Sequence, residues 1–390
     1  MKKILLCLLM AVSCANPQYI EDGKEIVLRD TERTKYVGLD DIFEPLQTVC
    51  LETKDSCMLQ RIEKVEVVDD CYYVLEGRVR PAVLVFDSKG RFVRRIGTQG
   101  HGKGEYVNAA DFTVDQTNGR VVILSAPSKV YIYDLQGQFI KSKDLGKAYC
   151  WSVTSTDDGY VCSTNHRTYT TGDDAFLLYF FDKDFEVKEK KIPVLNHQIY
   201  TPAFVSSPFQ RNNGKDYFVD NYTNKIYDLA ATEGDGNYQL CLTNPMPTKL
   251  FETINTFSAN QRKYDFLKDV LLLGEDAVFV YIQNAQQSVE SASLSGKVFV
   301  HGCYGRDFPQ MFSDGKGCAI LCISAYTYAK DRMDGFLPEL KEKLKASDNH
   351  IFVKCRLKKV TTEKIMPLFL YVAARIPIFA HGYCSLKNNE

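Results

Sequence analysis

The 390-residue sequence has no excess of either charge and no long uncharged apolar run. Lys and Arg number 48 against 49 Asp and Glu, so the chain has no overall positive field to attract nucleic acid. We therefore expect no nucleic-acid partner. The apolar run Ile4–Met10 is too short to span a bilayer, and Ile365–Phe379 is interrupted by two prolines and an arginine. Neither run predicts a transmembrane helix.

Local motifs for metal binding and catalysis are also missing. The sequence has no Cys-x-x-Cys pair, no His-x-x-x-His pair and no Gly-x-Ser-x-Gly nucleophile elbow. Six histidines are present, at positions 101, 166, 197, 301, 350 and 381. We therefore assign no catalytic, cofactor-binding or metal-ligating residue and expect no cofactor, although distant side chains could still converge in space.

One glycine-rich segment partly resembles a phosphate-binding loop. Gly97–Lys103 has the required spacing of glycines and lysine, but Gly104 follows where Ser or Thr should hold Mg²⁺. The segment then enters another β-rich run rather than a helix whose first turn could face phosphates. It is predicted to be a structural loop in which glycines allow positive φ.

The first residues predict export. Two lysines precede the apolar run Ile4–Met10, and Ala11–Cys14 resembles a lipobox, in which the cysteine is acylated and becomes the new N-terminus. We expect a signal peptide over 1–13, lipidation of Cys14, an N-terminal tether over 14–34 and membrane attachment through the lipid anchor. An ordinary signal peptide with an incidental cysteine is the alternative. The expected compartment is the outer membrane of a bacterial envelope, with its periplasmic or surface face open.

Eleven cysteines follow Cys14, an odd number that cannot all form pairs. Many lie in apolar runs such as Cys318–Cys322, where a thiol behaves as a small hydrophobic group. We expect most to be buried free thiols. Cys50 and Cys57 are close enough in sequence that a disulfide between them stays open as an alternative.

The middle of the chain repeats one pattern with a period of about 45 residues. Ala82–Phe86 is followed by the turn Asp87–Gly90 and another strand-like run. Val130–Tyr133 is followed in the same way by Asp134–Gly137. Short strands at this period are typical of propeller blades, each of which buries both faces against its neighbours. The sequence therefore predicts an all-β chain with a six-bladed β-propeller over 35–360.

Three further features refine this prediction. Val37–Leu51 is expected to close the ring. If this segment instead formed a blade of its own, the propeller would have seven blades. Leu250–Asp269 and Asp331–Ala346 show helical spacing and are expected to be short helical insertions packed on the rim. Acidic residues recur in the turns, where a carboxylate accepts backbone N–H bonds; they are Asp87, Asp134, Asp182 and Asp184.

Three passages resemble the six-bladed β-propeller lipoproteins of Bacteroidetes, which share their architecture with NHL and TolB-like propellers. They are Leu39–Ile42 with Val49–Thr53, Phe86–Tyr106, and Ser347–Val353, although Lys103 stands where that group usually has Pro. The resemblance implies a fold and brings no catalytic residue. The tail 361–390 does not match this group.

The expected function is that of a cell-envelope binding or scaffold module for a peptide, a glycan or a protein partner. An exposed rim of tyrosines is the expected binding surface, because the chain has 23 Tyr. The alternative is a propeller hydrolase or lyase with a metal or acid–base site at the central channel. Catalysis is the less favoured of the two because no local motif supports it.

Overall fold

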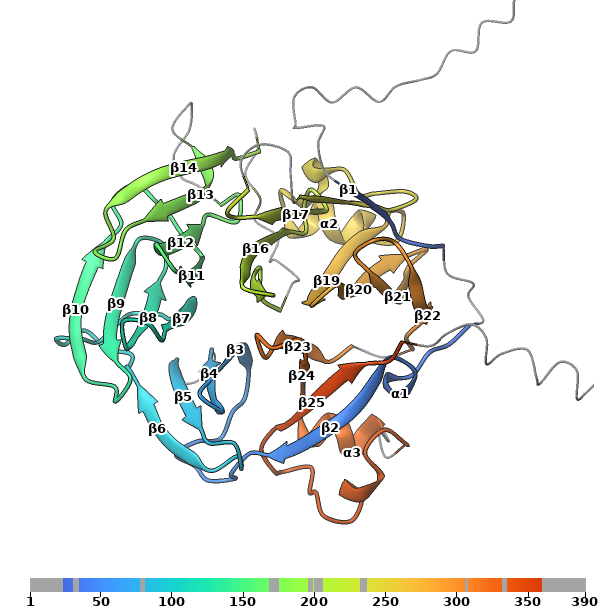
Figure 1. Cartoon of the computed structure of the whole chain (residues 1–390), viewed down its shortest axis with the longest axis horizontal. Helices are drawn as coiled ribbons and strands as arrows, with labels where there is room; N and C mark the ends of the chain where they lie inside the picture. The colour runs from blue at the N-terminus through green and yellow to red at the C-terminus, as the bar shows by residue number, and fades with distance from the viewer. Residues whose placement is uncertain are drawn as a thin grey trace, which may run out of the picture.

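The described strands form six small sheets, antiparallel except for one added parallel strand, arranged as blades around a central axis (Figure 1). The computed structural model describes residues 24–30, 35–77, 81–167, 175–195, 199, 206–231, 237–305, 308–331 and 335–359. Blades one to three follow the chain in order, with each first strand innermost and each fourth strand outermost. Blade one contains β3 (Ile62–Val68), β4 (Cys71–Glu76), β5 (Ala82–Phe86) and β6 (Phe92–Ile96). Blade two contains β7 (Asp111–Asp115), β8 (Arg120–Ser125), β9 (Lys129–Asp134) and β10 (Phe139–Asp144), and blade three contains β11 (Ser152–Thr156), β12 (Gly159–Ser163), β13 (Phe176–Phe181) and β14 (Val187–Pro193).

The other three blades include both N-terminal strands. Blade four contains β15 (Phe209–Asn212), β16 (Lys215–Asp220), β17 (Lys225–Asp228), β18 (Tyr238–Cys241) and, outside β18, the parallel strand β1 (Lys24–Val27). Blade five contains β19 (Phe266–Leu273), β20 (Asp276–Gln283), β21 (Gln286–Ser293) and β22 (Val298–Cys303). Blade six contains β23 (Gln310–Ser313), β24 (Ala319–Ile323), β25 (Ile351–Leu357) and, outermost, β2 (Phe43–Cys50). The predicted six-bladed propeller is therefore confirmed.

Burial explains the residue pattern within a blade. Middle strands such as β5 and β24 are buried along their whole length because neighbouring blades cover both of their faces. The outer strand β10 alternates between half-buried and exposed residues because one side meets solvent. Pro45 lies in the outer strand β2 at a register shift, where the missing N–H interrupts no inner ladder. Apolar clusters lie between successive blades rather than in one central core.

The ring closes as expected from the sequence. β2 pairs antiparallel with β25, so the first and last parts of the propeller share one sheet. Residues 24–27, within the segment that we expected to be a tether, instead form β1 on blade four. The N-terminal segment thus contacts three successive blades, because Val37 also pairs with Cys303 at the edge of blade five.

The helical predictions are only partly confirmed. Leu250–Asp269 contains the end of the 3₁₀ helix η1 (Thr248–Phe251) and α2 (Ile254–Asn260), but β19 already begins at Phe266. The prediction of a helix over Asp331–Ala346 was wrong for the described part of that stretch: α3 (Ala325–Asp331) ends where the helix should begin, and the 3₁₀ helix η3 (Pro338–Leu340) and turns lie within it. Turns bury Leu337 and Leu340 in place of a helical face. A further helix, α1 (Leu39–Ile42), leads into β2.

Candidate functional site

The propeller has two unlike faces because strand direction alternates within each blade. On one face, here called the turn face, most connections are tight turns between a blade's first and second strands or its third and fourth strands. The opposite face, here called the loop face, carries the connections between second and third strands and between blades. Among the connections that are described throughout, the two long segments 97–110 and 242–265 lie there.

A buried charged cluster lies where the innermost strands of blades one to three meet. Lys64 on β3 forms ion pairs with Glu66 Oε1 at 3.0 Å and Asp111 Oδ1 at 3.2 Å. The same ammonium donates to the carbonyls of Phe112 at 2.6 Å and Val153 at 3.1 Å. Four oxygen atoms therefore surround the Lys64 nitrogen.

Both carboxylates of this cluster also bind the backbone of the next blade. Glu66 accepts from Val114 N at 2.8 Å, and Asp111 accepts from Val153 N at 2.8 Å. Burial opposes the charge of Lys64, but Asp111 and Glu66 outweigh it and raise the pKa of the ammonium. The cluster thus joins three inner strands, and its acidic groups are satisfied by partners within the chain.

Other channel side chains make similar connections between blades. Gln210 on β15 bonds the backbone of Val270 and Leu272 on β19, and Gln310 on β23 donates to Ile62 O at the start of β3. Asp269 is 7% exposed, and burial raises the pKa of its carboxyl to about 7. It accepts from the backbone N and the hydroxyl of Ser206. These contacts hold the inner ring together.

A buried His–Asp pair lies between blades three and four on the loop face. His166 Nε2 and Asp220 Oδ2 are 3.0 Å apart, and both side chains are 2% exposed. Leu195 N donates to His166 Nδ1, so that nitrogen is an acceptor and Nε2 carries the proton toward Asp220. Because both ring nitrogens already have partners, this pair has the geometry of a structural contact rather than that of a poised general base.

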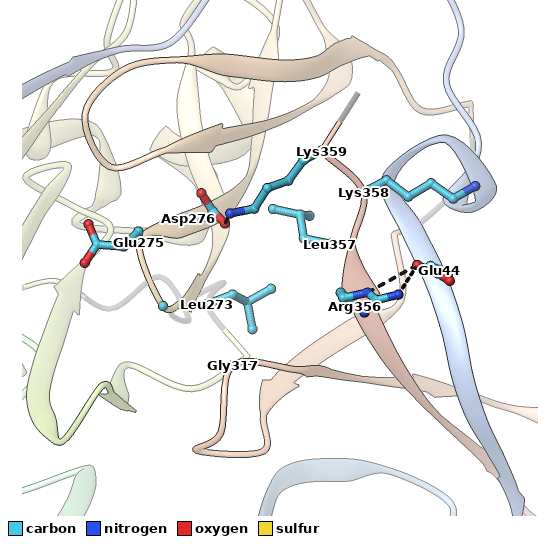
Figure 2. A pocket seen from close by; sticks show the side chains of 10 residues that line it. Glu44, Leu273, Glu275, Asp276, Gly317, Arg356, Leu357, Lys358 and Lys359 are labelled. Atoms are coloured by element: carbon cyan, nitrogen blue, oxygen red, sulfur yellow. Dashed lines mark hydrogen bonds and ion pairs between the residues drawn. The ribbon is translucent and has the colours of Figure 1, made fainter. Parts of the chain in front are cut away.

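A cavity of about 700 Å³ opens on the turn face between blades five and six (Figure 2). Its floor includes Leu273 at the end of β19 and Leu357 at the end of β25, whose side chains point toward each other in Figure 2. Ten residues line it: Glu44, Leu273, Gly274, Glu275, Asp276, Gly317, Arg356, Leu357, Lys358 and Lys359.

The cavity rim carries both signs of charge. Arg356 donates twice to Glu44 Oε2, at 3.2 and 2.8 Å, and Lys359 pairs with Asp276 at 2.8 Å. Glu275 lies on one side of the rim, away from both pairs (Figure 2). Among the described lining residues none is aromatic. The cavity can therefore hold an apolar group on its floor and charged groups of either sign at its edge.

The structure places several residues that the sequence singled out. Asp87, Asp134 and Asp182 each accept two backbone N–H bonds within their turns, as predicted. Asp184 instead pairs with Lys141 at 2.7 Å. Gly97 and Gly104 of the glycine-rich segment have positive φ, at 75° and 77°, in the connection between β6 and β7. The predicted lipidation residue, Cys14, and the tail 361–390 lie outside the described residues.

Other expectations need correction. The described tyrosines do not form an exposed rim: most are buried, and the strongly exposed ones among them are Tyr36 and Tyr326, on different blades. Cys50 and Cys57 are both free thiols, so the alternative of a disulfide between them is wrong. Six of the described cysteines are buried, as expected: Cys57, Cys150, Cys162, Cys303, Cys322 and Cys355.

Sequence reasoning missed the charged cluster and the cavity. The run Ile62–Val68 places Glu63, Lys64 and Glu66 among apolar residues of a strand, and this unusual placement was the available signal. Within the described ranges, no group of three or more His, Cys, Asp or Glu side chains is arranged to hold a metal ion. None of the described helices is both long enough and apolar enough to cross a membrane.

Comparison with known proteins places this architecture in a family. Residues 25–356 match the family described as Domain of unknown function (DUF4934). The chain belongs to this family. The DUF4934 match runs from β1 to β25 and therefore includes all six blades. The comparison with curated proteins found no match.

A solved structure from Bacteroides fragilis resembles the DUF4934 chain in fold. A Bacteroides fragilis protein described as a candidate exported protein is 18% identical, with a TM-score of 0.67, over 86% of this chain and 100% of that one. BamB from Moraxella catarrhalis is 10% identical, with a TM-score of 0.39, over 71% of this chain and 75% of that one. Raptor from Chaetomium thermophilum is 11% identical, with a TM-score of 0.42, over 82% of this chain and 29% of that one.

Proposed function

We propose that this protein is an exported, lipid-anchored binding protein whose propeller holds a peptide segment of an envelope partner in the cavity between blades five and six. The observation that carries the proposal is the cavity itself. Its volume of about 700 Å³ lies in the range of ligand sites, and leucines at the floor with ion pairs at the rim suit an apolar side chain flanked by charged ones.

Two further observations support a binding role. The buried acid and base groups that we described, around Lys64 and at His166, already have partners within the chain. A polypeptide also suits the cavity better than a glycan does, because no described lining residue offers an aromatic face for a sugar ring. Among the described residues, the β19–β20 and β23–β24 connections beside the cavity are short turns, which leave room for an extended segment.

Export and anchoring are supported by the sequence of residues 1–14 and by the description of the Bacteroides fragilis protein with the same fold. The test is to express the full chain, a Cys14→Ala variant and a Cys7→Ala control in a bacterial host and to follow acyl-label incorporation and membrane fractionation. Loss of both signals in Cys14→Ala alone is expected. Equal labelling of all three chains would contradict lipidation at Cys14.

Peptide binding is tested by selecting a displayed random-peptide library on the purified chain. Affinities of the selected peptides are then measured by calorimetry on Glu275→Lys, Lys359→Glu and Lys297→Glu variants. Lys359 and Glu275 line the cavity, whereas Lys297 lies in the β21–β22 turn of the same face outside it. We expect about tenfold weaker binding in either cavity variant and unchanged binding in Lys297→Glu. Peptides that bind all three variants equally would contradict the proposed site.

A further inference from the structure

The first described strand lies in a groove between blades four and five. β1 extends the edge of β18 in parallel, and the ladder runs from Lys24 N, which donates to Asn237 O at 2.9 Å, to Leu28 N, which donates to Cys241 O at 3.0 Å. Figure 1 shows β1 lying across the outer part of blade four, beside blade five. The segment occupies an edge at which β18 would otherwise leave backbone groups unpaired.

Beyond this ladder, side chains of blade five bind the backbone of residue 29. Glu290 Oε2 accepts from Arg29 N at 3.0 Å, and Tyr281 Oη donates to Arg29 O at 2.7 Å. The carboxylate of the next residue, Asp30, accepts from Thr243 Oγ1 at 2.5 Å and from Gln283 Nε2. The groove thus recognises one residue by its backbone and the next by its acidic side chain.

Alternate side chains of the segment point into the groove. Ile26 is 1% exposed and Leu28 is 2% exposed, and both pack in the apolar cluster between blades four and five. Val27, between them, is 65% exposed. Backbone pairing combined with pockets for every second side chain is how proteins recognise peptides by strand addition. The segment pattern is therefore two apolar residues two positions apart, followed by an acidic residue two positions later.

The ring closes without this segment, and within the described ranges the segment does not provide hydrogen-bond partners for all the polar groups of the groove. β2 closes the propeller through β25, so blade pairing around the ring does not require β1. Glu290 is 0% exposed, yet its Oε1 atom has no hydrogen-bond partner among the described residues, and neither does Ser288 Oγ on the same face of β21. A peptide site that retains unused acceptors can bind another occupant more tightly.

We infer that the groove between blades four and five is a peptide-binding site, filled within the chain by residues 24–30, that takes in their place an extended segment of another polypeptide with the same apolar-x-apolar-x-acidic pattern. This site is distinct from the cavity between blades five and six. The inference stands without the proposed function, because it rests on the contacts of residues 24–30 alone.

The test uses the chain from residue 15 to residue 390 with a specific protease sequence inserted after Thr31. Cleavage leaves residues 24–30 held by the groove alone. A fluorescent peptide of residues 24–30 is then added, and its anisotropy is followed with cut and uncut chains. We expect saturable binding to the cut chain and none to the uncut chain. We also expect at least tenfold weaker binding of an Ile26→Asp peptide and unchanged binding of the matched Val27→Asp peptide.

Mass analysis after gel filtration shows whether the cut chain has kept its own segment. If the cut chain keeps its segment, the same peptide is added to a cut chain that carries Ile26→Asp, which we expect to lose its own segment and to bind the peptide. A cut chain that carries Val27→Asp should keep its segment. Three results overturn it: a cut chain that has lost its segment and takes up no peptide, an uncut chain that binds as well as the cut one, or equal binding of the Ile26→Asp and Val27→Asp peptides. None of these readouts depends on the cavity or on Cys14.

Discussion

At the scale of single residues, Lys64 supplies the positive charge that neutralises two carboxylates on the inner strands. Replacing it by Met would leave the buried carboxylate of Asp111 and the partly buried carboxylate of Glu66 without their counter-charge. We expect Lys64→Met to lower the free energy of unfolding by about 3–5 kcal/mol, measured by denaturant unfolding at pH 7. The loss should be smaller at pH 5, because burial raises the pKa of the Asp111 carboxyl and a protonated Asp111 needs no counter-charge.

The matched control is Lys141→Met, which removes another lysine ion pair at 2.7 Å, to Asp184. These side chains are 40% and 73% exposed, so water already screens the interaction. The expected cost is below about 1 kcal/mol. Equal losses in the two variants would contradict the view that Lys64 serves as an internal cation.

Glu290 predicts how pH affects the attachment of β1. Burial raises the pKa of its carboxyl from 4.5 to about 7. Between pH 4.5 and about pH 7, Glu290 is ionised in the unfolded chain but still protonated in the folded chain. The free energy of unfolding therefore falls as pH rises through this range, and the cost of burying the ionised carboxylate is fully present above about pH 7. Because Glu290 accepts from Arg29 N, we expect this penalty to weaken the docking of residues 24–28.

The measurement is the hydrogen-exchange protection of the Leu28 amide, corrected for the intrinsic pH dependence of exchange. Protection should be several-fold lower at pH 8 than at pH 6 in the wild-type chain. In Glu290→Gln, which has no charge to bury, it should be the same at both pH values. An identical pH dependence in the two chains would show that Glu290 does not control β1.

At the scale of elements, the acidic turn residues have a cause that can be tested. Asp134 Oδ1 accepts from Gln136 N at 3.0 Å and Gln138 N at 2.7 Å, which fixes the turn between β9 and β10. We expect Asp134→Ala to cost about 1–2 kcal/mol in unfolding free energy, and Asp134→Asn less, because an amide oxygen still accepts. Asp158→Ala is the control, since no hydrogen bond to this exposed turn side chain is found among the described residues. Equal effects at Asp134 and Asp158 would reject the capping role.

The strands could be predicted from sequence better than the helices could. A blade's middle strand is covered on both faces, so runs such as Ala82–Phe86 are continuously apolar and are readily recognised. The spacing of Leu337, Leu340 and Leu344 was equally regular, yet Leu337 and Leu340 are buried by a 3₁₀ turn with Pro338 at its start. Regularly spaced apolar residues are buried both in the strand and in the turn. The spacing therefore predicts burial but does not specify whether the backbone is a helix or a turn.

At the scale of the whole molecule, the ring was predictable and its sites were not. A period of about 45 residues specifies blades and their order, because each repeat must cover the next. The channel cluster joins Lys64, Asp111 and Val153 across three blades, and the cavity joins Glu44 to Arg356 across most of the chain. Such contacts form only when the ring closes. Local patterns in a single sequence do not show which distant residues the closed ring brings together.

The two N-terminal strands should therefore have different effects on the intact ring. A chain beginning at residue 31 lacks β1 but keeps β2, so blade six remains complete. It loses the burial of Ile26 and Leu28, which contributes about 3–6 kcal/mol together. We expect this chain to be monomeric and cooperative, with a lower melting temperature.

A chain beginning at residue 51 lacks both strands and exposes the edge of β25, a seven-residue strand with buried Ile351, Val353 and Cys355. An unpaired apolar edge of this kind promotes association with other chains. Light scattering after gel filtration should therefore show aggregates or higher oligomers for this chain alone. If both truncated chains remain monomeric and lose the same stability, β2 does not hold the ring closed. If both aggregate, β1 is as necessary to the ring as β2, and the groove between blades four and five is part of the fold rather than a separable site.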